Sequence, residues 1–299
     1  MALALEGVSK VYRIGMFGRN ELVAVRNVSF ELARGEVVSL IGESGSGKST
    51  IGRMLLRLLP ATDGSIRLDG ADIADFRRRD VKRYYATVQG VFQDPFSSYN
   101  PIFKADRALS MIRSAYFPGM SRSAWNDKLA DSLRAVGLNP RDVLGKYPHQ
   151  LSGGQLQRLL NARALLLEIG YLVADEIISM LDASTRIDVL NLLGDLKEKG
   201  LGILFITHDL SLGNYISDRT IILRHGSIVE LGATQKVFEN PRHPYTKLLL
   251  ESVPQLHKKW EPNGSPRRAP ADDAETALVE VDRDHFAAVA PAAAERRSL

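Results

Sequence analysis

The chain has 299 residues, of which 44% are hydrophobic and 25% are charged, as expected of a globular protein with room for a large core in one or two domains. It contains no cysteine, which excludes disulfides and thiolate metal sites. The formal net charge is only +4, and apart from the short run Arg77-Arg78-Arg79 there is no dense basic block, so a nucleic-acid-binding face is not expected.

No apolar stretch approaches the roughly 20 residues that span a bilayer. Residues 1–6 also lack the basic flank and the apolar core of a signal peptide. A role at a membrane is therefore expected to depend on partner chains.

The N-terminal part predicts a layer of antiparallel strands. Leu22–Phe30 and Ile66–Leu68 are alternating or apolar runs with Gly and Asp turns between them. Val37–Ile41 predicts a buried strand that runs straight into a glycine-rich turn.

The turn after Val37–Ile41 matches the pattern G-x-x-x-x-G-K-[ST] in full, and its place between a strand and a helix identifies a phosphate-binding P-loop. Glycines let the backbone wrap around phosphates, Lys48 is expected to reach the β- and γ-phosphates, and the Ser49 hydroxyl is expected to ligate Mg²⁺. The predicted nucleotide-binding residues of this segment are Gly42, Glu43, Ser44, Gly45, Ser46, Gly47, Lys48, Ser49 and Thr50.

A helix is expected after this turn, with one apolar stripe formed by Ile51, Met54, Leu55 and Leu58. Pro60 and the pair Asp63-Gly64 are expected to end it.

Residues from about 101 to 150 predict a separate helical lobe, with helices at Ala105–Tyr116 and Ser123–Val136. A second glycine-rich turn, Leu151–Gln155, follows and also leads into a predicted helix. Each of the two turns offers backbone N–H groups and the positive end of a helix dipole to an anion. Together they indicate a triphosphate that is held from two directions.

Two more apolar strands are predicted at Tyr171–Ala174 and Ile203–Ile206, and strands that alternate with helices indicate a mainly parallel sheet. The first of them ends in Asp175 and Glu176. Asp175 is the expected second Mg²⁺ partner beside the P-loop, and Glu176 is a candidate general base for the attacking water.

The composition becomes rich in Pro, Ala, Arg and Asp from about Pro262, which predicts a weakly ordered tail. Within this tail, Ala277–Val281 is interpreted as a docked strand.

Together these segments resemble the ATP-binding cassette (ABC) family. Leu151–Gln155 is similar to its signature sequence and Ser179–Asp182 to its D-loop. His208 resembles the switch histidine, Gln93 the Q-loop glutamine, and Tyr12 the aromatic residue that stacks on adenine.

The resemblance covers about residues 3–255 and implies an α/β fold, the ABC nucleotide-binding domain of the P-loop NTPases. Such a domain has a RecA-like parallel sheet core, an antiparallel β subdomain and an α-helical subdomain, here at about residues 95–165. The implied division is an ATP-binding domain at 1–255 and a partly disordered C-terminal extension at 256–299.

The resemblance also implies ATP and Mg²⁺ as cofactors and assigns roles to individual residues. The implied catalytic residues are Lys48, Gln93, Glu176 and His208, and the implied metal ligands are Ser49, Gln93 and Asp175. Further nucleotide contacts are implied for Tyr12, Gln93, Ser152, Gly153, Gly154, Gln155, Asp175 and Asp182.

Single residues keep alternative interpretations. Tyr12 is alternatively interpretable as an exposed strand aromatic, Gln93 as a turn residue, and His208 as a structural histidine. For each of them the family role is the favoured interpretation.

In this family the signature contacts the nucleotide of a facing subunit. The resemblance therefore implies a head-to-tail pair of cassettes, with two ATP molecules between Lys48 of one subunit and Ser152 of the other. Hydrolysis is expected to let the pair open.

Within the family, the chain most resembles the ATPases of dipeptide and oligopeptide importers. The segments that carry this resemblance are 93–101, Tyr147–Gln150 and Val237–Thr246. In this group a short helix of the membrane subunit enters the groove near the Q-loop, so Phe96 and Tyr99 are candidate contacts.

The chain departs from the family pattern at Ile177, where proline is usual, and at Leu156 and Asn161 of the signature helix. The cysteine cluster of many peptide-importer ATPases is missing. An oligosaccharide or nickel importer of the same branch is therefore the main alternative. A soluble ATPase acting on nucleic acid or ribosomes and a noncatalytic scaffold subunit are less favoured, because the chain lacks a second cassette and keeps every catalytic residue.

The expected partners are two transmembrane permease subunits, a second ABC ATPase subunit in a homo- or heterodimer, and, indirectly, an extracytoplasmic solute-binding protein. No nucleic-acid partner is expected. The expected location is peripheral, at the cytoplasmic face of the inner (plasma) membrane.

Overall fold

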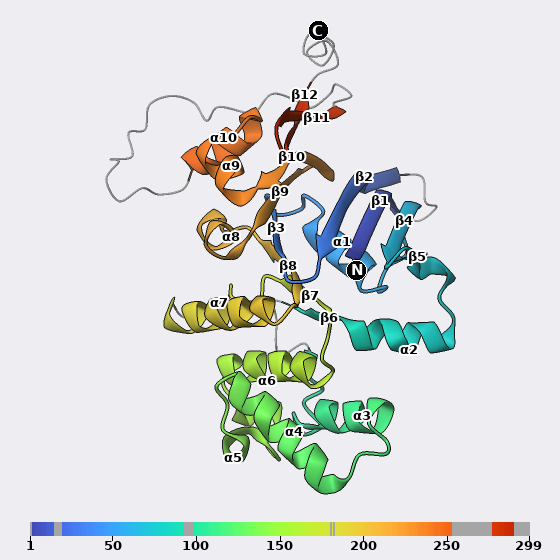
Figure 1. The fold of residues 1–299 in the computed structure, drawn as a ribbon, viewed down its shortest axis with the longest axis vertical. Coiled ribbons are helices and arrows are strands. Elements are labelled where there is room, and N and C mark those ends of the chain that lie inside the picture. Colours follow the sequence, from blue (N-terminus) through green and yellow to red (C-terminus); the bar gives the residue numbers. More distant parts are fainter. Residues whose placement is uncertain are drawn as a thin grey trace.

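A computed structural model describes residues 2–14, 20–92, 98–179, 181, 183–252 and 277–289. Figure 1 shows two sheets in the upper part of the molecule and a helical lobe below them.

The smaller sheet is antiparallel, as predicted. Its strand order is β2 (Asn20–Ala33), β1 (Ala2–Ile14), β4 (Asp63–Leu68) and β5 (Ala71–Asp72). Along β1, Leu3, Leu5 and Val8 are buried, so this sheet presents one apolar face to the rest of the molecule.

The larger sheet has eight strands in the order β11-β12-β10-β9-β3-β8-β7-β6. Five strands are mutually parallel: β3 (Val37–Ile41), β6 (Val88–Val91), β7 (Tyr171–Asp175), β8 (Gly202–Thr207) and β9 (Arg219–Arg224). Three antiparallel strands extend one edge: β10 (Ser227–Ala233), β11 (Ala277–Asp282) and β12 (His285–Val289). Every residue of β3, β7 and β8 is buried, which is typical of parallel strands covered on both faces.

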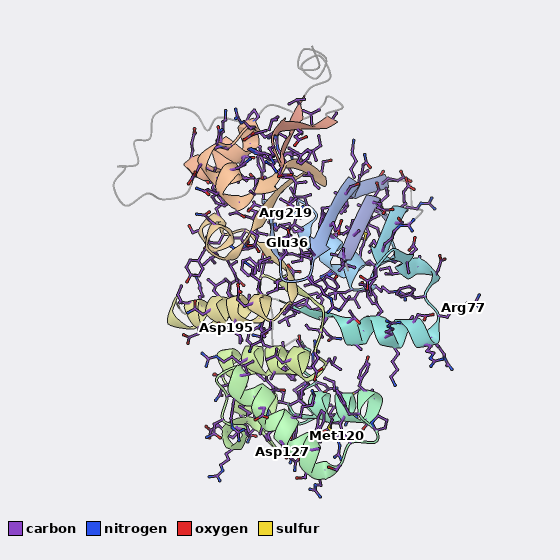
Figure 2. All side chains as sticks on the ribbon, viewed as in Figure 1. Glu36, Arg77, Met120, Asp127, Asp195 and Arg219 are labelled. Atoms are coloured by element: carbon purple, nitrogen blue, oxygen red, sulfur yellow. The ribbon has the colours of Figure 1, made fainter. Side chains whose placement is uncertain are left out.

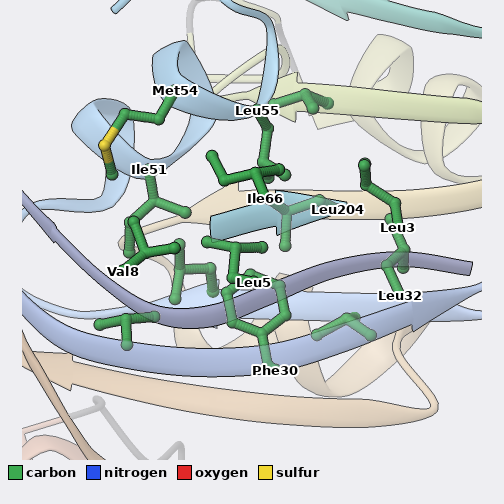
Figure 3. Close-up of a cluster of buried hydrophobic side chains, with 14 of the residues drawn as sticks. Leu3, Leu5, Val8, Phe30, Leu32, Ile51, Met54, Leu55, Ile66 and Leu204 are labelled. Carbon is green, nitrogen blue, oxygen red and sulfur yellow. The ribbon is translucent and has the colours of Figure 1, made fainter. Parts of the chain in front are cut away.

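Helix α1 (Lys48–Leu55) lies between the two sheets. Figure 3 shows how its residues Ile51, Met54 and Leu55 meet side chains of β1, β2, β4 and β8 in one apolar cluster. This packing fixes the helix that begins within the P-loop.

The expected end of this helix was wrong. Helix α1 ends at Leu55, and Arg57 adopts a left-handed φ of 54°. The chain therefore turns before Pro60, and Leu58 is 56% exposed instead of continuing the buried stripe. The carbonyl of Leu55 accepts a hydrogen bond from the buried Tyr84 hydroxyl of α2 (Arg78–Thr87), which satisfies the helix end.

The opposite face of the large sheet is covered by α7 (Ala183–Glu198) and part of α6 (Gly153–Leu166). Helix α8 (Leu210–Ile216) packs against β3 and β8 of the sheet. The short helices α9 (Thr234–Glu239) and α10 (Pro244–Glu251) pack against β10, near the edge of the sheet. At the start of β9, Arg219 forms an ion pair of 2.8 Å with Glu36, and Figure 2 labels both residues.

The helical lobe contains α3 (Arg107–Tyr116), α4 (Arg122–Ala135), α5 (Pro140–Val143) and α6. Among the described residues, a short 3-10 helix η1 (Ile73–Asp75) precedes α2, outside the lobe, and another, η3 (Pro148–Gln150), precedes α6. The lobe has its own apolar core around Leu109, Trp125 and Leu133. The predicted helices at Ala105–Tyr116 and Ser123–Val136 are confirmed with slightly different ends.

The docked strand predicted at Ala277–Val281 is confirmed as β11, but it reaches the sheet through β12, which was not predicted. Most of the tail predicted to be weakly ordered from about Pro262, namely 262–276 and 290–299, lies outside the described residues, as does 253–261. None of the helices in the described part of the chain is long and apolar enough to cross a membrane.

Candidate active site

The candidate site lies at the carboxyl ends of three neighbouring strands. Ile41 of β3 pairs with Thr207 of β8, and Ile206 of β8 pairs with Asp175 of β7. The P-loop, the Asp175-Glu176 pair and His208 therefore leave the sheet at the same edge. This edge is where open α/β sheets bind their ligands.

Two glycines let the P-loop pass close to other backbone. A Cβ atom on Gly42 would lie 2.2 Å from the Leu223 carbonyl oxygen. A Cβ atom on Gly47, whose φ is 106°, would lie 2.4 Å from the Ala24 carbonyl oxygen. Only glycine fits these positions without displacing backbone.

The P-loop presents several donors suited to an anion. Gly47 caps α1 and has no side chain that could bind the first N–H groups of the helix. Ser46 Oγ is buried and has no hydrogen-bond partner among the described residues. Lys48 is 5% exposed, and its Nζ donates to the carbonyl oxygens of Gly42 at 2.7 Å and Glu43 at 2.8 Å.

Burial lowers the pKa of Lys48, and the nearby carboxylates of Glu176, Asp175 and Glu43 oppose this effect. A buried ammonium held by backbone carbonyls is a good partner for a bound phosphate. These donors fit the phosphates of a nucleotide.

Ser49 and Asp175 form a pair of oxygen ligands. The Ser49 hydroxyl donates to Asp175 Oδ1 at 3.3 Å. Asp175 is 7% exposed, and burial raises the pKa of its carboxyl group. Mg²⁺ usually takes one or two carboxylates together with phosphate oxygens and water, and this pair fits that donor set. Within the described residues there is no cluster of three or more acidic or histidine side chains arranged to hold a metal ion.

The structure brings Glu176 and His208 together. His208 Nδ1 lies 3.1 Å from Glu176 Oε1, and the histidine side chain is 60% exposed. Glu176 has a left-handed φ of 51°, and its N–H donates to the Ile206 carbonyl at 2.9 Å. Strained non-glycine residues concentrate at functional sites. Ile177, at the usual proline position, is buried in the core on the α7 side of the sheet.

The second glycine-rich turn begins α6 with a capping box. Ser152 Oγ accepts the Gln155 N–H at 3.2 Å, and Gln155 Oε1 accepts the Ser152 N–H at 3.0 Å. Ser152 is exposed, and Gly153 and Gly154 form the first turn. Among the described residues, no hydrogen bond or ion pair joins this turn to the P-loop of the same chain.

Tyr12 is half-buried at the far end of β1, where it pairs with Leu22 of β2. Two residues further along β2, Ala24 packs against Gly47 of the P-loop. The ammonium of Lys10 lies 5.5 Å from the centre of the Tyr12 ring. Gln93 and Asp182, together with Phe96, lie outside the described residues.

One contact of the P-loop was not expected from the sequence. The Glu43 N–H donates to the hydroxyl of Tyr245, which lies on α10. The segment Val237–Thr246 was recognisable by resemblance, but no local pattern shows that its tyrosine reaches the P-loop.

Comparisons with known proteins agree with this geometry. Residues 25–179 match the family described as ABC transporter, and residues 229–277 match the family described as oligopeptide/dipeptide transporter, C-terminal region. A putative peptide import ATP-binding protein of Brucella ovis is 43% identical over 84% of this chain and 78% of its own length. The oligopeptide transport ATP-binding protein OppF of Streptococcus mutans is 39% identical over 89% of this chain and 88% of its own.

Among solved structures, the dimeric bacterial ABC transporter cassette MJ0796 superposes with a TM-score of 0.70. The aligned region has 28% sequence identity and covers 78% of this chain and 98% of the MJ0796 chain. A second structure of MJ0796 is a dimer in a post-hydrolysis state with ADP and phosphate, and its TM-score is 0.69. On the P-loop geometry, the fold and these matches, the chain belongs to the ABC transporter family of ATP-hydrolysing cassettes, in the group that carries the oligopeptide/dipeptide transporter C-terminal region.

Proposed function

We propose that this chain is the ATP-hydrolysing subunit of an importer for oligopeptides. The observation that carries the proposal is the pairing of Glu176 with His208 and of Ser49 with Asp175 beside one P-loop. The peptide-import names of the relatives and the match at residues 229–277 support the cargo. Residues 229–277 match this family although they contain no cysteine, and the names of the relatives favour a peptide over an oligosaccharide or nickel as the cargo.

The P-loop residues bind and orient the nucleotide in this proposal. The buried Lys48 ammonium exchanges its carbonyl partners for the β- and γ-phosphate oxygens, and the backbone N–H groups at the start of α1 complete the cradle. Ser49 and Asp175, with Gln93 as a further ligand, would hold Mg²⁺, which neutralises charge on the phosphates. Tyr12 is assigned to the adenine ring because β2 joins its strand to the P-loop.

Glu176 is the proposed general base. Its carboxylate accepts a hydrogen bond from the attacking water and takes its proton as the water oxygen bonds to the γ-phosphorus. The bond from the γ-phosphorus to the β,γ-bridging oxygen breaks in the same step, and ADP is the leaving group. His208 holds one oxygen of this carboxylate through Nδ1 and thereby orients it.

The exposed signature turn is assigned to the ATP of a facing cassette. The start of α6 is exposed at Ser152 and half-exposed at Gly153, Gly154 and Gln155, so a γ-phosphate bound by the other subunit can meet this turn. Asp182, which lies outside the described residues, is assigned to the same interface by its resemblance to the family's D-loop. The dimeric state of MJ0796 supports such a pair. Hydrolysis separates the γ-phosphate from ADP, and release of this phosphate removes the anion that both subunits contact, so the pair then opens.

The remaining assembly follows from this proposal. Two permease subunits span the membrane, a solute-binding protein delivers the peptide outside the cell, and this chain lies at the cytoplasmic face of the membrane. The cassette is assigned to residues 1–255, with the helical subdomain at about 95–165. The extension 256–299 contributes the β11–β12 hairpin to the cassette's sheet.

Steady-state ATP hydrolysis by the assembled transporter tests the role of Glu176. Glu176→Gln keeps the size and the polar contacts of the side chain but removes the base, so kcat is expected to fall at least about 100-fold while ATP still binds. Glu198→Gln, the same change at an exposed position of α7, is the control and should leave kcat unchanged. Full turnover by Glu176→Gln would refute the assignment.

The cargo is tested on the solute-binding protein that co-purifies with the permeases and this chain. Mass spectrometry of its bound ligand is expected to find peptides of several residues. An oligosaccharide or a nickel chelate in that site would contradict the peptide assignment while leaving the ATPase assignment intact.

A further inference from the structure

Tyr245 contacts the P-loop from the C-terminal part of the chain. The Glu43 N–H donates to the Tyr245 hydroxyl at 3.3 Å, although the two residues are 202 positions apart. Tyr245 is 2% exposed, and the Arg224 guanidinium lies 5.0 Å from the centre of its ring. Burial raises the pKa of the Tyr245 hydroxyl, so this group stays protonated at neutral pH.

The hydrogen bond from Glu43 fixes a peptide group that Lys48 also uses. The N–H of the Gly42–Glu43 peptide is bound by Tyr245, and the carbonyl of the same peptide accepts Lys48 Nζ at 2.7 Å. The next carbonyl, that of Glu43, accepts Lys48 Nζ at 2.8 Å and the Ser46 N–H at 3.1 Å. A rotation of the Gly42–Glu43 peptide would therefore move a carbonyl that holds the phosphate-binding lysine.

Helix α10 holds Tyr245 through the sequence His243-Pro244-Tyr245. His243 Nδ1 caps the helix by accepting the Tyr245 N–H at 3.1 Å, and Pro244 occupies the first helical position, where its fixed φ suits a helix start. Tyr245 thus stands in the first turn of a capped helix, which limits the positions that its ring can take.

The start of α10 is fixed in turn by a buried carboxylate. Glu230 of β10 has no exposed surface, and its two oxygens accept the N–H groups of Arg242 at 2.7 Å and His243 at 2.9 Å. His285 Nε2 of β12 lies 2.8 Å from the same carboxylate. The β11–β12 hairpin, next to β10 at the edge of the large sheet in Figure 1, thereby supports the segment that carries Tyr245.

We propose that Tyr245 is a positioning residue of the nucleotide site, whose hydroxyl fixes the Gly42–Glu43 peptide and so places Lys48 for the phosphates of ATP. This inference rests on the proposed function of the P-loop. Tyr245 itself contacts the loop and no reacting atom, so its effect is on the binding of ATP rather than on the chemical step.

The test compares two variants of α10 that each lose one buried hydroxyl in the assembled transporter. Tyr245→Phe keeps the ring but removes the hydrogen bond to Glu43, and KM for ATP is expected to rise about two- to tenfold with kcat nearly unchanged. Thr246→Val is the matched control, because Thr246 is fully buried and its hydroxyl has no hydrogen-bond partner. It should leave both KM and kcat at the wild-type values.

Hydrogen exchange of the Glu43 amide in the full chain gives a second readout that does not depend on turnover. Tyr245→Phe should accelerate this exchange, and Thr246→Val should not. An unchanged KM and unchanged exchange in Tyr245→Phe would overturn the proposal, and so would an equal rise of KM in Thr246→Val. Lys48→Ala distinguishes failure of the Tyr245 proposal from failure of the proposed ATP binding by the P-loop. If Lys48→Ala still binds ATP like wild type, the P-loop assignment itself fails.

Discussion

At the scale of single residues, Asp175 combines burial with a negative charge at the end of β7. Burial raises the pKa of this carboxyl group in the folded chain, so the folded state holds its proton more tightly than the unfolded chain does. The stability that this group contributes is present below the ordinary carboxyl pKa and is lost as the pH rises through the raised value. At neutral pH the buried charge of Asp175 therefore lowers the stability of the folded chain, at the position that we propose for a Mg²⁺ ligand.

Asp175→Asn should consequently make the ligand-free chain more stable than wild type at pH 7, and the gain should shrink as the pH falls toward 4. Denaturant unfolding in the presence of a chelator measures the difference. Asp195→Asn is the control, since Asp195 is an exposed residue of α7 that Figure 2 shows at the surface. Equal or lower stability of Asp175→Asn at pH 7 would show that the buried charge carries no such cost.

The site residues that follow from local patterns were predicted from the sequence. Lys48, Ser49 and Asp175 lie within a motif or directly after a buried strand, and parallel strands bring such ends together by geometry alone. The pairing of Glu176 with His208 was not predicted, because it depends on β7 and β8 being neighbours in the sheet, which only the structure gives. Their chemical roles stay proposals until the variants are measured.

At the scale of elements, the signature helix α6 contains an apolar position occupied by a polar residue. Asn161 is 4% exposed, and neither its amide nitrogen nor its amide oxygen has a hydrogen-bond partner. A buried amide without partners costs about 1–3 kcal/mol of stability. This departure from the family pattern was visible in the sequence, but its energetic cost needed the structure.

Asn161→Val is expected to raise the free energy of unfolding by about 1 kcal/mol, because it removes the unsatisfied amide and has a similar helix propensity. Asn126→Val, at an exposed position of α4, makes the same substitution without removing a buried group and should change stability by less than about 0.5 kcal/mol. Thermal and denaturant unfolding measure both variants. A loss of stability in Asn161→Val would mean that the amide has a partner in solution.

Two elements show where sequence patterns were insufficient. Helix α1 ends early because Arg57 takes a left-handed conformation. Glycine and asparagine are the residues that usually mark this conformation in a sequence, and an arginine gives no such signal. Strand β12 is short and contains two alanines, which are weak strand formers, and it is held by β10 and by the contact of His285 with Glu230. Both depend on contacts with distant parts of the chain.

At the scale of the whole molecule, the nucleotide site depends on parts of the chain that lie far apart in sequence. The P-loop near the N-terminus is backed by β2, β9 and α10. The family's C-terminal region is therefore structurally connected to the nucleotide site, and the resemblance of Val237–Thr246 to peptide-importer ATPases gains a physical meaning through Tyr245. The signature turn, in contrast, makes no bond to this P-loop within the described residues.

The central claim is that ATP held by the P-loop of one cassette is completed by the signature turn of the facing cassette. A structure of the Glu176→Gln transporter with ATP and Mg²⁺ tests it most directly, by measuring the distance from each γ-phosphoryl group to the facing signature turn. Ser152 of this chain is expected to lie within hydrogen-bond distance, about 3 Å, of the γ-phosphate bound by its partner cassette. A closed complex in which each γ-phosphate contacts only the chain that binds it would contradict the account.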